Sequence, residues 1–251
     1  MRRQCNRGDP AFFHLRLIPM GMEILALIPA RGGSRGLPGK NVRPLRGMPL
    51  LAHSVSQARS ARLVSRVVVS TDADEIAAVA REHGAEVIAR PAELSGDSAS
   101  SEAALLHALD WLRDHEDWVP DLVCFLQCTS PLRSPGEIDD AIERLWADGA
   151  DSLLSVSPSH RFLWRQGSDG AEAINYDWRT RPRRQDMTPQ FVENGSIYLF
   201  RPDGLRATGN RLHGRVAMHP MSELAAFEID TLLDFQLVEA LFAGRFEKEA
   251  T

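Results

Sequence analysis

Short apolar runs alternate with segments of helical periodicity through the first part of this chain of 251 residues. The apolar runs that predict buried strands span residues 24–28, 66–70, 86–89, 122–127 and 152–156. Helical spacing of apolar side chains is found between them, at residues 50–61, 74–83, 100–114 and 135–147. This βαβα order predicts a three-layer α/β fold, in which helices cover both faces of a mostly parallel, twisted sheet. Ligands of such sheets bind beyond the carboxyl ends of the strands.

The pattern changes at residues 158–193, where aromatic and arginine residues replace the regular repeat. Short strand-like pieces and a basic cluster indicate an excursion from the sheet, either an interaction arm or a substrate-binding flap. Trp164 and Trp178 argue against a merely solvated loop, because exposed apolar patches usually mark interaction sites. Residues 195–200 and 215–218 then predict two further strands, and residues 231–243 predict a closing helix.

The loop that follows the first predicted strand, within residues 27–41, is rich in glycine and in positive charge. Glycines allow tight turns that bring backbone N–H groups close to an anion. Arg31, Arg35 and Lys40 add cations that together can neutralise a polyphosphate. Lys40 stands out because the chain has only one other lysine among its 29 basic residues. This loop is therefore predicted to cradle the phosphates of a nucleotide.

Better-known glycine-rich motifs do not fit this loop. A Walker A loop needs serine or threonine directly after its lysine, where this chain has Asn41. A Rossmann fingerprint enters a helix directly, whereas Pro38 and Gly39 keep this loop open. Gly32 to Gly36 also matches the G-x-S-x-G elbow of serine hydrolases, but that serine lies where a helix begins. A serine hydrolase that uses Ser34 is kept as a rival hypothesis.

Two carboxylates lie two positions apart near the end of the chain, at Glu228 and Asp230. On an extended segment, both side chains point to the same side. Mg²⁺ in proteins is commonly held by one or two carboxylates together with substrate phosphates and water. Asp230 equally suits the N-cap of the closing helix. Metal binding, capping and a division of these roles between the two residues all stay open at this point.

Composition narrows the class of partner. With 43% apolar residues and a net charge of −5, the chain resembles a globular domain and not a general nucleic-acid binder. No apolar run is long enough to span a membrane, and three cysteines without metal-ligand spacing suit a reducing cytoplasm.

Residues 1–21 are expected to form a poorly ordered extension before a domain at residues 22–251. Met1, Met20 or Met22 is then the natural start.

Six blocks of sequence resemble the acylneuraminate cytidylyltransferases, enzymes that make CMP-sialic acids and related CMP-nonulosonates. In order, the blocks are IPARGGSRGLPGKN (28–41), VSTD (69–72), RPAELSGDSASS (90–101), LQCTSPLR (126–133), NGSIY (194–198) and EIDT (228–231). The resemblance covers the chain from about residue 23 to residue 243. It implies a Rossmann-like nucleotidyltransferase fold and a homodimer, in which residues 158–193 form a small dimerisation arm that helps to build the partner's site.

The resemblance also implies roles for the matching positions. Those implied to hold or contact CTP are Arg31, Arg35, Lys40, Asn41, Arg90 and Ser101. Those implied to contact the sugar acid are Gln127, Arg184 and Gln185. Those implied to bind Mg²⁺, or Mn²⁺ in its place, are Glu228 and Asp230. Those expected to act in catalysis are Arg31, Lys40 and Asp230.

The implied reaction is attack by the anomeric hydroxyl of a nonulosonic acid on the α-phosphorus of CTP, which gives a CMP-sugar and pyrophosphate. Departures from the family pattern at Cys128, Val192 and Glu228 leave the sugar open among N-acetylneuraminate, legionaminate, KDN and similar acids. KDO is disfavoured because Gln127 is followed by Cys128 and Thr129. A metal-bound water and the substrate's own carboxylate are alternative bases for the hydroxyl. A nucleotide-binding module without turnover is the second rival hypothesis.

Overall fold

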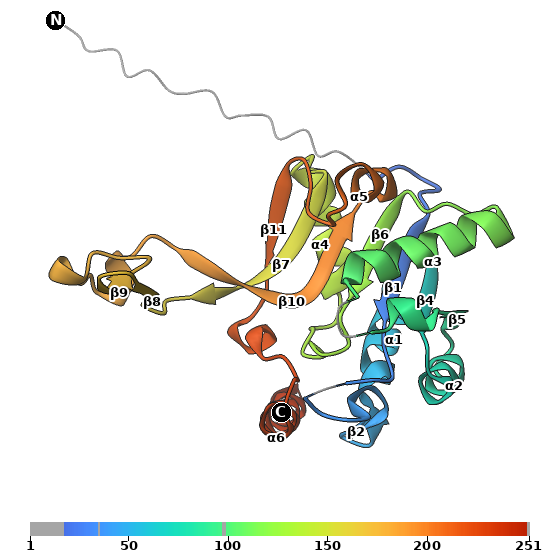
Figure 1. The fold of residues 1–251 in the computed structure, drawn as a ribbon, viewed down its shortest axis with the longest axis horizontal. Coiled ribbons are helices and arrows are strands. Elements are labelled where there is room, and N and C mark those ends of the chain that lie inside the picture. Colours follow the sequence, from blue (N-terminus) through green and yellow to red (C-terminus); the bar gives the residue numbers. More distant parts are fainter. Residues whose placement is uncertain (1–17, 35, 97–98, 250–251) are drawn as a thin grey trace, which may run out of the picture.

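The computed structural model describes residues 18–34, 36–96 and 99–249, and it contains a seven-stranded sheet (Figure 1). The strand order is β11-β7-β10-β6-β1-β4-β5. These strands are β1 (Ile24–Pro29), β4 (Arg66–Thr71), β5 (Glu86–Ala89), β6 (Leu122–Leu126), β7 (Ser152–Ser159), β10 (Gln190–Phe200) and β11 (Val216–Pro220). Strand β10 pairs antiparallel with β6 and β7, and the other neighbours pair in parallel. The predicted mostly parallel sheet is confirmed.

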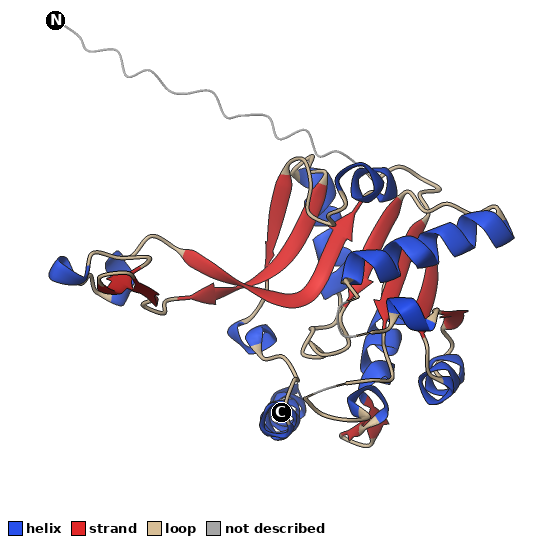
Figure 2. Cartoon of the chain, in the orientation of Figure 1, coloured by secondary structure: helices blue, strands red, loops and turns tan. Residues whose placement is uncertain are grey.

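Helices cover both faces of this sheet (Figure 2). Along β1, Ile24, Ala26 and Ile28 pack on one face, while Leu25 and Leu27 pack on the other. The first face is covered by α1 (Leu50–Ser60), α2 (Asp74–Glu82) and α4 (Glu137–Ala147). The second face is covered by α3 (Ser101–Glu116) and α5 (Pro202–Thr208). Burial on both sides explains why these strands are continuous apolar runs and do not alternate with polar residues.

A third apolar cluster joins the glycine-rich loop to the last helix, α6 (Leu232–Glu249). Leu37 comes from the loop, Ile229 from between the two acidic residues, and Phe235 from α6. The small hairpin that adds to this cluster consists of β2 (Pro44–Leu45) and β3 (Met48–Pro49). These contacts bring residues near the two ends of the chain to the same edge of the sheet.

Strands β7 and β10 continue beyond the body of the sheet and carry the residues between them away from it (Figure 1). They were expected to end at residue 156 and to begin at residue 195, but Gln190 pairs with Ser159. The antiparallel pairing of the two strands sustains this extension and leaves residues 160–189 as the projecting segment, here called the arm. Its regular elements are β8 (Trp164–Gly167), β9 (Gly170–Ala173), and the 3-10 turns η3 (Trp178–Thr180) and η4 (Arg184–Asp186).

The extension predicted at residues 1–21 lies mostly outside the described residues, as do Met1 and Arg35. Among the residues that the structure describes, no helix combines the length and the apolar character needed to cross a membrane.

Candidate active site

A cavity of about 360 Å³ lies at the carboxyl ends of β1 and β6, where the α/β topology predicts a ligand. The predicted site residues that line it are Arg31, Lys40, Asn41, Ser101, Gln127 and Asp230. A larger cavity of about 990 Å³ lies near the amino end of β1, around Ile18, Met22 and Val64. The smaller cavity is the candidate site, because it brings together cations and a carboxylate from segments far apart in the sequence.

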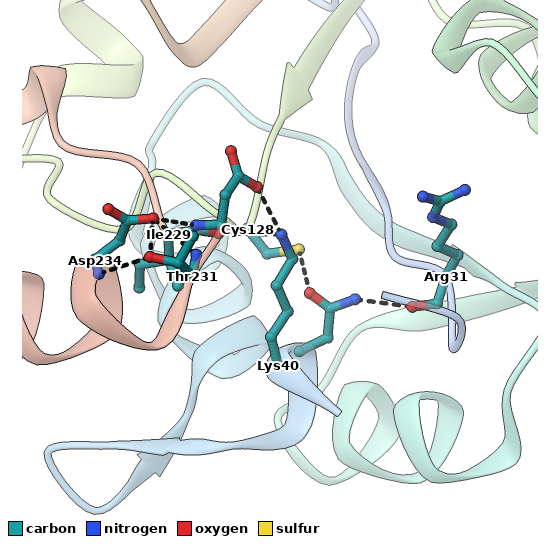
Figure 3. Close-up of polar contacts among 8 residues, drawn as sticks. Arg31, Lys40, Cys128, Ile229, Thr231 and Asp234 are labelled. Atoms are coloured by element: carbon teal, nitrogen blue, oxygen red, sulfur yellow. Dashed lines mark hydrogen bonds and ion pairs between the residues drawn. The ribbon is translucent and has the colours of Figure 1, made fainter. Parts of the chain in front are cut away.

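Lys40 connects the glycine-rich loop to the acidic segment (Figure 3). Its ammonium donates to the Ile229 carbonyl at 3.0 Å and to Asp230 Oδ1 at 2.9 Å. The two chain segments approach so closely that a Cβ atom built on Gly36 would lie 2.2 Å from the Asp230 carbonyl oxygen. Glycine is therefore required at position 36 by this close approach and not only by the bend of the loop.

The structure answers the question of what caps the last helix. The Thr231 hydroxyl accepts from the Asp234 N–H at 3.2 Å, and Asp234 Oδ2 accepts from the Thr231 N–H at 2.7 Å (Figure 3). This reciprocal pair is a capping box with Thr231 as the N-cap. The capping alternative for the Asp230 side chain is therefore wrong, since its neighbour supplies the cap. Its carboxylate contacts Lys40 and lines the cavity instead.

Asn41 holds the backbone of the glycine-rich loop in place. Its side-chain amide donates to the Arg31 carbonyl at 3.0 Å, and its Oδ1 accepts from the Cys128 thiol at 3.2 Å (Figure 3). Burial raises the pKa of Cys128, so this thiol keeps its proton at neutral pH and acts as a donor. The Arg31 guanidinium donates to the Gly96 carbonyl at 3.0 Å. The loop is thus tied to the segment after β6 and to the segment after β5.

Arg90 is linked to the glycine-rich loop through Asp72 and does not line the cavity. It is buried, its Nη2 lies 3.7 Å from Asp72 Oδ1, and the same oxygen accepts from the Gly32 N–H at 3.0 Å. Burial lowers the pKa of Arg90.

Ser101 is the first residue of α3 and follows the N-cap Ser100. Its position at the cavity is therefore next to a helix N-terminus, which favours anions.

Gln127 and Glu228 meet at Gly195, where β10 takes a left-handed turn with a φ of +63°. A Cβ atom at Gly195 would lie 2.2 Å from Glu228 Oε1 and 2.5 Å from Gln127 Oε1. A larger residue at this position would therefore push both side chains away. Burial raises the pKa of Glu228, and repulsion from Asp230 and Glu193 adds to this effect.

Arg184 and Gln185 lie on the arm and do not line the cavity of their own chain. The Arg184 guanidinium instead lies 3.3 Å from Glu223 Oε1.

The described residues contain no cluster of three or more side chains suited to a metal ion. Glu228 and Asp230 offer two oxygen ligands, which fits Mg²⁺ if phosphates and water complete its coordination.

A family model described as cytidylyltransferase matches residues 25–244. The chain belongs to the cytidylyltransferase family. It is 36% identical over 233 residues to N-acylneuraminate cytidylyltransferase A of Danio rerio, an alignment that covers 90% of this chain and 53% of that protein. It is 33% identical over 230 residues to the CMP-N,N'-diacetyllegionaminic acid synthase of Campylobacter jejuni, covering 88% of this chain and 95% of that protein.

This cytidylyltransferase chain spans about half the length of the fish relatives that it matches. Among solved structures it is similar to a CMP:2-keto-3-deoxy-manno-octonic acid synthetase complexed with CTP, with a TM-score of 0.67 and 19% identity. That alignment covers 89% of this chain and 99% of the other. A second similar structure is 4-diphosphocytidyl-2C-methyl-D-erythritol synthase from Anaerococcus prevotii, with a TM-score of 0.64 and 13% identity. These two likenesses support the Rossmann-like fold.

Two residues that shape the site of this cytidylyltransferase were given no individual role from the sequence. Asp72 holds the Gly32 N–H, and the Tyr198 hydroxyl donates to Glu193 beside the Gly195 turn. Burial, followed by the bond to Glu193, raises the pKa of Tyr198. Asp72 and Tyr198 both end blocks of the family pattern, at 69–72 and 194–198. Their position within those blocks was the signal that could have found them.

Proposed function

We propose that this chain transfers CMP from CTP to the anomeric hydroxyl of a nonulosonic acid and releases pyrophosphate. The observation that carries the proposal is the contact of Lys40 with Asp230 across one wall of the cavity. It joins a loop suited to phosphates to a carboxylate suited to a metal ion. The names of the relatives from Danio rerio and Campylobacter jejuni agree with this chemistry.

The residues of the chain divide the work around the phosphates. Arg31 and Lys40 line the cavity and would neutralise the charge that builds on the α-phosphate and on the leaving pyrophosphate. Asp230, with Glu228 beside it, would hold Mg²⁺. When bound, Mg²⁺ stabilises negative charge on phosphate oxygens as a Lewis acid. Lys40 neutralises Asp230 in the free protein, and its flexible ammonium can pass from the carboxylate to a phosphate oxygen.

The remaining predicted contacts follow the same division. Asn41 would act mainly by holding the loop, because its side chain is buried and bonded to Arg31 and Cys128. Gln127 lines the cavity at the end of β6 and would contact the sugar acid. Arg35 and Arg90 would contact the nucleotide. Arg90 would also hold Asp72, which it contacts in the structure.

We also propose that two copies of the chain pair through the arm. Trp178 is 52% exposed and Ile174 56% exposed, and burial of such side chains favours association. Arg184 and Gln185 would then reach the sugar-acid end of the partner's cavity, which agrees with their absence from the cavity of their own chain.

We further propose the cytoplasm as the compartment. Cys124 and Cys128 are free thiols, which suits a reducing environment.

The test is pyrophosphate release from CTP and Mg²⁺ with a panel of nonulosonic acids that includes N-acetylneuraminate, legionaminate and KDN. Release with CTP but not with UTP or ATP is expected, and the acid that supports it identifies the sugar. Asp230→Asn, which keeps the size of the side chain, serves as the inactive control. CTP binding without release for any acid would favour a binding module. Inactivation by a phosphonate attached to Ser34 would favour a hydrolase.

A further inference from the structure

Arg133 is a buried cation whose hydrogen bonds all go to neutral groups. The side chain follows β6 and is only 4% exposed. Its guanidinium donates to Ser54 Oγ at 3.0 Å, Gln57 Oε1 at 2.9 Å, the Gln127 carbonyl at 2.8 Å and the Ser196 carbonyl at 2.7 Å. Among the described residues no carboxylate forms an ion pair with it, and the negative charge of Glu137 acts on it only from a longer distance.

Burial of a charge without a counter-charge is costly. The cost is visible in Arg133, since burial lowers its pKa to about 10. At neutral pH the group nevertheless stays protonated and keeps its donors. An apolar side chain in the same space would leave the Gln127 and Ser196 carbonyls without their donor. The arginine therefore holds these two backbone positions relative to each other, and both lie beside the site.

The two carbonyls that Arg133 holds lie where the pairing of β6 with β10 stops. Leu126 pairs with Ile197 at the last position of that ladder, so Gln127 and Ser196 are the next residues on either strand. Gly195, directly before Ser196, is the turn against which the side chains of Gln127 and Glu228 pack. Arg133 thus bridges the end of β6 and the interior of β10, at the point where the pairing of these strands stops beside the site.

We propose that Arg133 is a positioning residue for the sugar-acid end of the site. By holding the Gln127 and Ser196 carbonyls together, it fixes the Gln127 side chain and the Gly195 turn relative to Glu228. The nucleotide end is held separately, through Lys40 and through the contact of Asn41 with Cys128. This inference rests on the proposed function for the identity of the sugar-acid end and for its kinetic readout.

The first test is the variant Arg133→Met. It removes all four hydrogen bonds and replaces the guanidinium with an unbranched apolar side chain. We expect KM for the sugar acid to rise and kcat to fall, each by about tenfold or more, because small displacements of reacting groups are costly. The Kd of CTP should change by less than about threefold. Arg133→Lys should restore part of the loss. Arg62→Met is the matched control, since Arg62 is exposed and pairs with Glu143 on the surface.

A second test does not depend on activity. Hydrogen exchange of the folded Arg133→Met protein should quicken in residues 126–130 and 190–200, and stay unchanged in residues 66–71 of β4, which do not pair with either segment. Unchanged sugar KM, or equal weakening of CTP and sugar acid, would overturn the proposal. Faster exchange over the whole sheet would show a merely structural role. An inactive wild-type protein would count against the proposed function and leave the exchange result to decide about Arg133.

A third test uses chemical rescue of Arg133→Ala, in case the Arg133→Met protein folds poorly. A cavity of about 430 Å³ is lined by Arg133, Gln57 and Ser134, and gives small molecules a path to the guanidinium position. Free guanidinium, well below unfolding concentrations, should restore turnover and local protection to Arg133→Ala. Methylammonium, a single-point cation, should not. Equal rescue by both ions, or by neither in a folded Arg133→Ala protein, would contradict the proposed bridge.

Discussion

The glycine-rich loop and the arm are both irregular segments with several arginines, but they differ in what holds them. The loop around Lys40 is bonded to residues far away in the same chain, at Ile229, Asp230 and Cys128 through Asn41. Contacts of the arm aromatics are mostly internal, such as the rings of Phe162 and Tyr176, whose centroids lie 4.4 Å apart.

This difference shows which part of the site a single chain can build. The loop has its partners within the chain, so its conformation is determined by the fold. The arm leaves apolar side chains such as Trp164 and Trp178 partly exposed. A surface outside the chain is needed to bury them, and the proposed second copy supplies one.

Lys40→Met removes the link between the loop and Asp230. We expect turnover to fall by about a thousandfold, because a cation that balances transition-state charge is lost. The thermal midpoint should change by less than about 3 °C, since the salt bridge is partly exposed and such pairs contribute little. Pyrophosphate release and thermal melting measure the two quantities. A folded Lys40→Met protein with near-normal turnover would remove Lys40 from the mechanism.

Trp164→Ser combined with Trp178→Ser tests the arm. These side chains are exposed in the single chain, so its secondary structure should be unchanged, while the mass in solution should fall from two copies to one. Activity should fall by about tenfold or more if the arm completes the partner's site. Light scattering after size exclusion measures the mass.

Leu233→Ser is the matched control for the arm variant. Leu233 is 73% exposed on α6, away from the arm, so its replacement removes apolar surface without touching the proposed interface. We expect the mass to stay at two copies. A double arm variant that also remains dimeric would show that the arm does not join the two copies.

Glu228→Gln tests the acidic side of the site. The raised pKa of Glu228 means that its ionised form is unfavourable in the folded protein at neutral pH. The variant should therefore melt higher at pH 7, by about 2 °C. As pH falls between the raised and the ordinary pKa, the native glutamate takes up a proton and this advantage should shrink to nothing.

The same substitution should impair metal use. We expect the Mg²⁺ concentration that gives half-maximal activity to rise by about tenfold, because one of the two proposed carboxylate ligands is lost. Melting curves at several pH values and Mg²⁺ titrations provide the measurements. A gain in stability without any change in Mg²⁺ dependence would leave Asp230 as the metal residue and Glu228 as a packing residue only.

Cys128→Ala should have the smallest effect. It removes the thiol donor to Asn41, a contribution of about 1 kcal/mol at most. KM for CTP should rise by about two- to fivefold with kcat little changed. Cys128→Ser should stay closer to the wild type, because the hydroxyl can still donate. A larger loss in the serine variant than in the alanine variant would argue against this hydrogen bond.

Much of the fold was visible in the order of the residues. Periodicity placed the sheet and its helices within a few residues, as in the strand predicted at 66–70 and observed as β4. The strand ends were less visible, because the extension of β7 and β10 depends on their pairing with each other. Three predicted site residues do not line the cavity: Arg90, and Arg184 and Gln185 on the arm. A local sequence pattern does not show which residues of a motif reach a cavity, because that depends on how the segments pack.

The alternation of strands and helices, the basic glycine-rich loop and the acidic pair can all be recognised in the amino-acid sequence, because each depends on neighbouring residues. Other features are visible only in the folded chain: Lys40 meets Asp230 across 190 positions, Thr231 caps α6, and Arg133 bridges the end of β6 and the interior of β10. Such contacts depend on strand order and on helix packing. Those follow from burial over the whole chain, and no short window of sequence contains them.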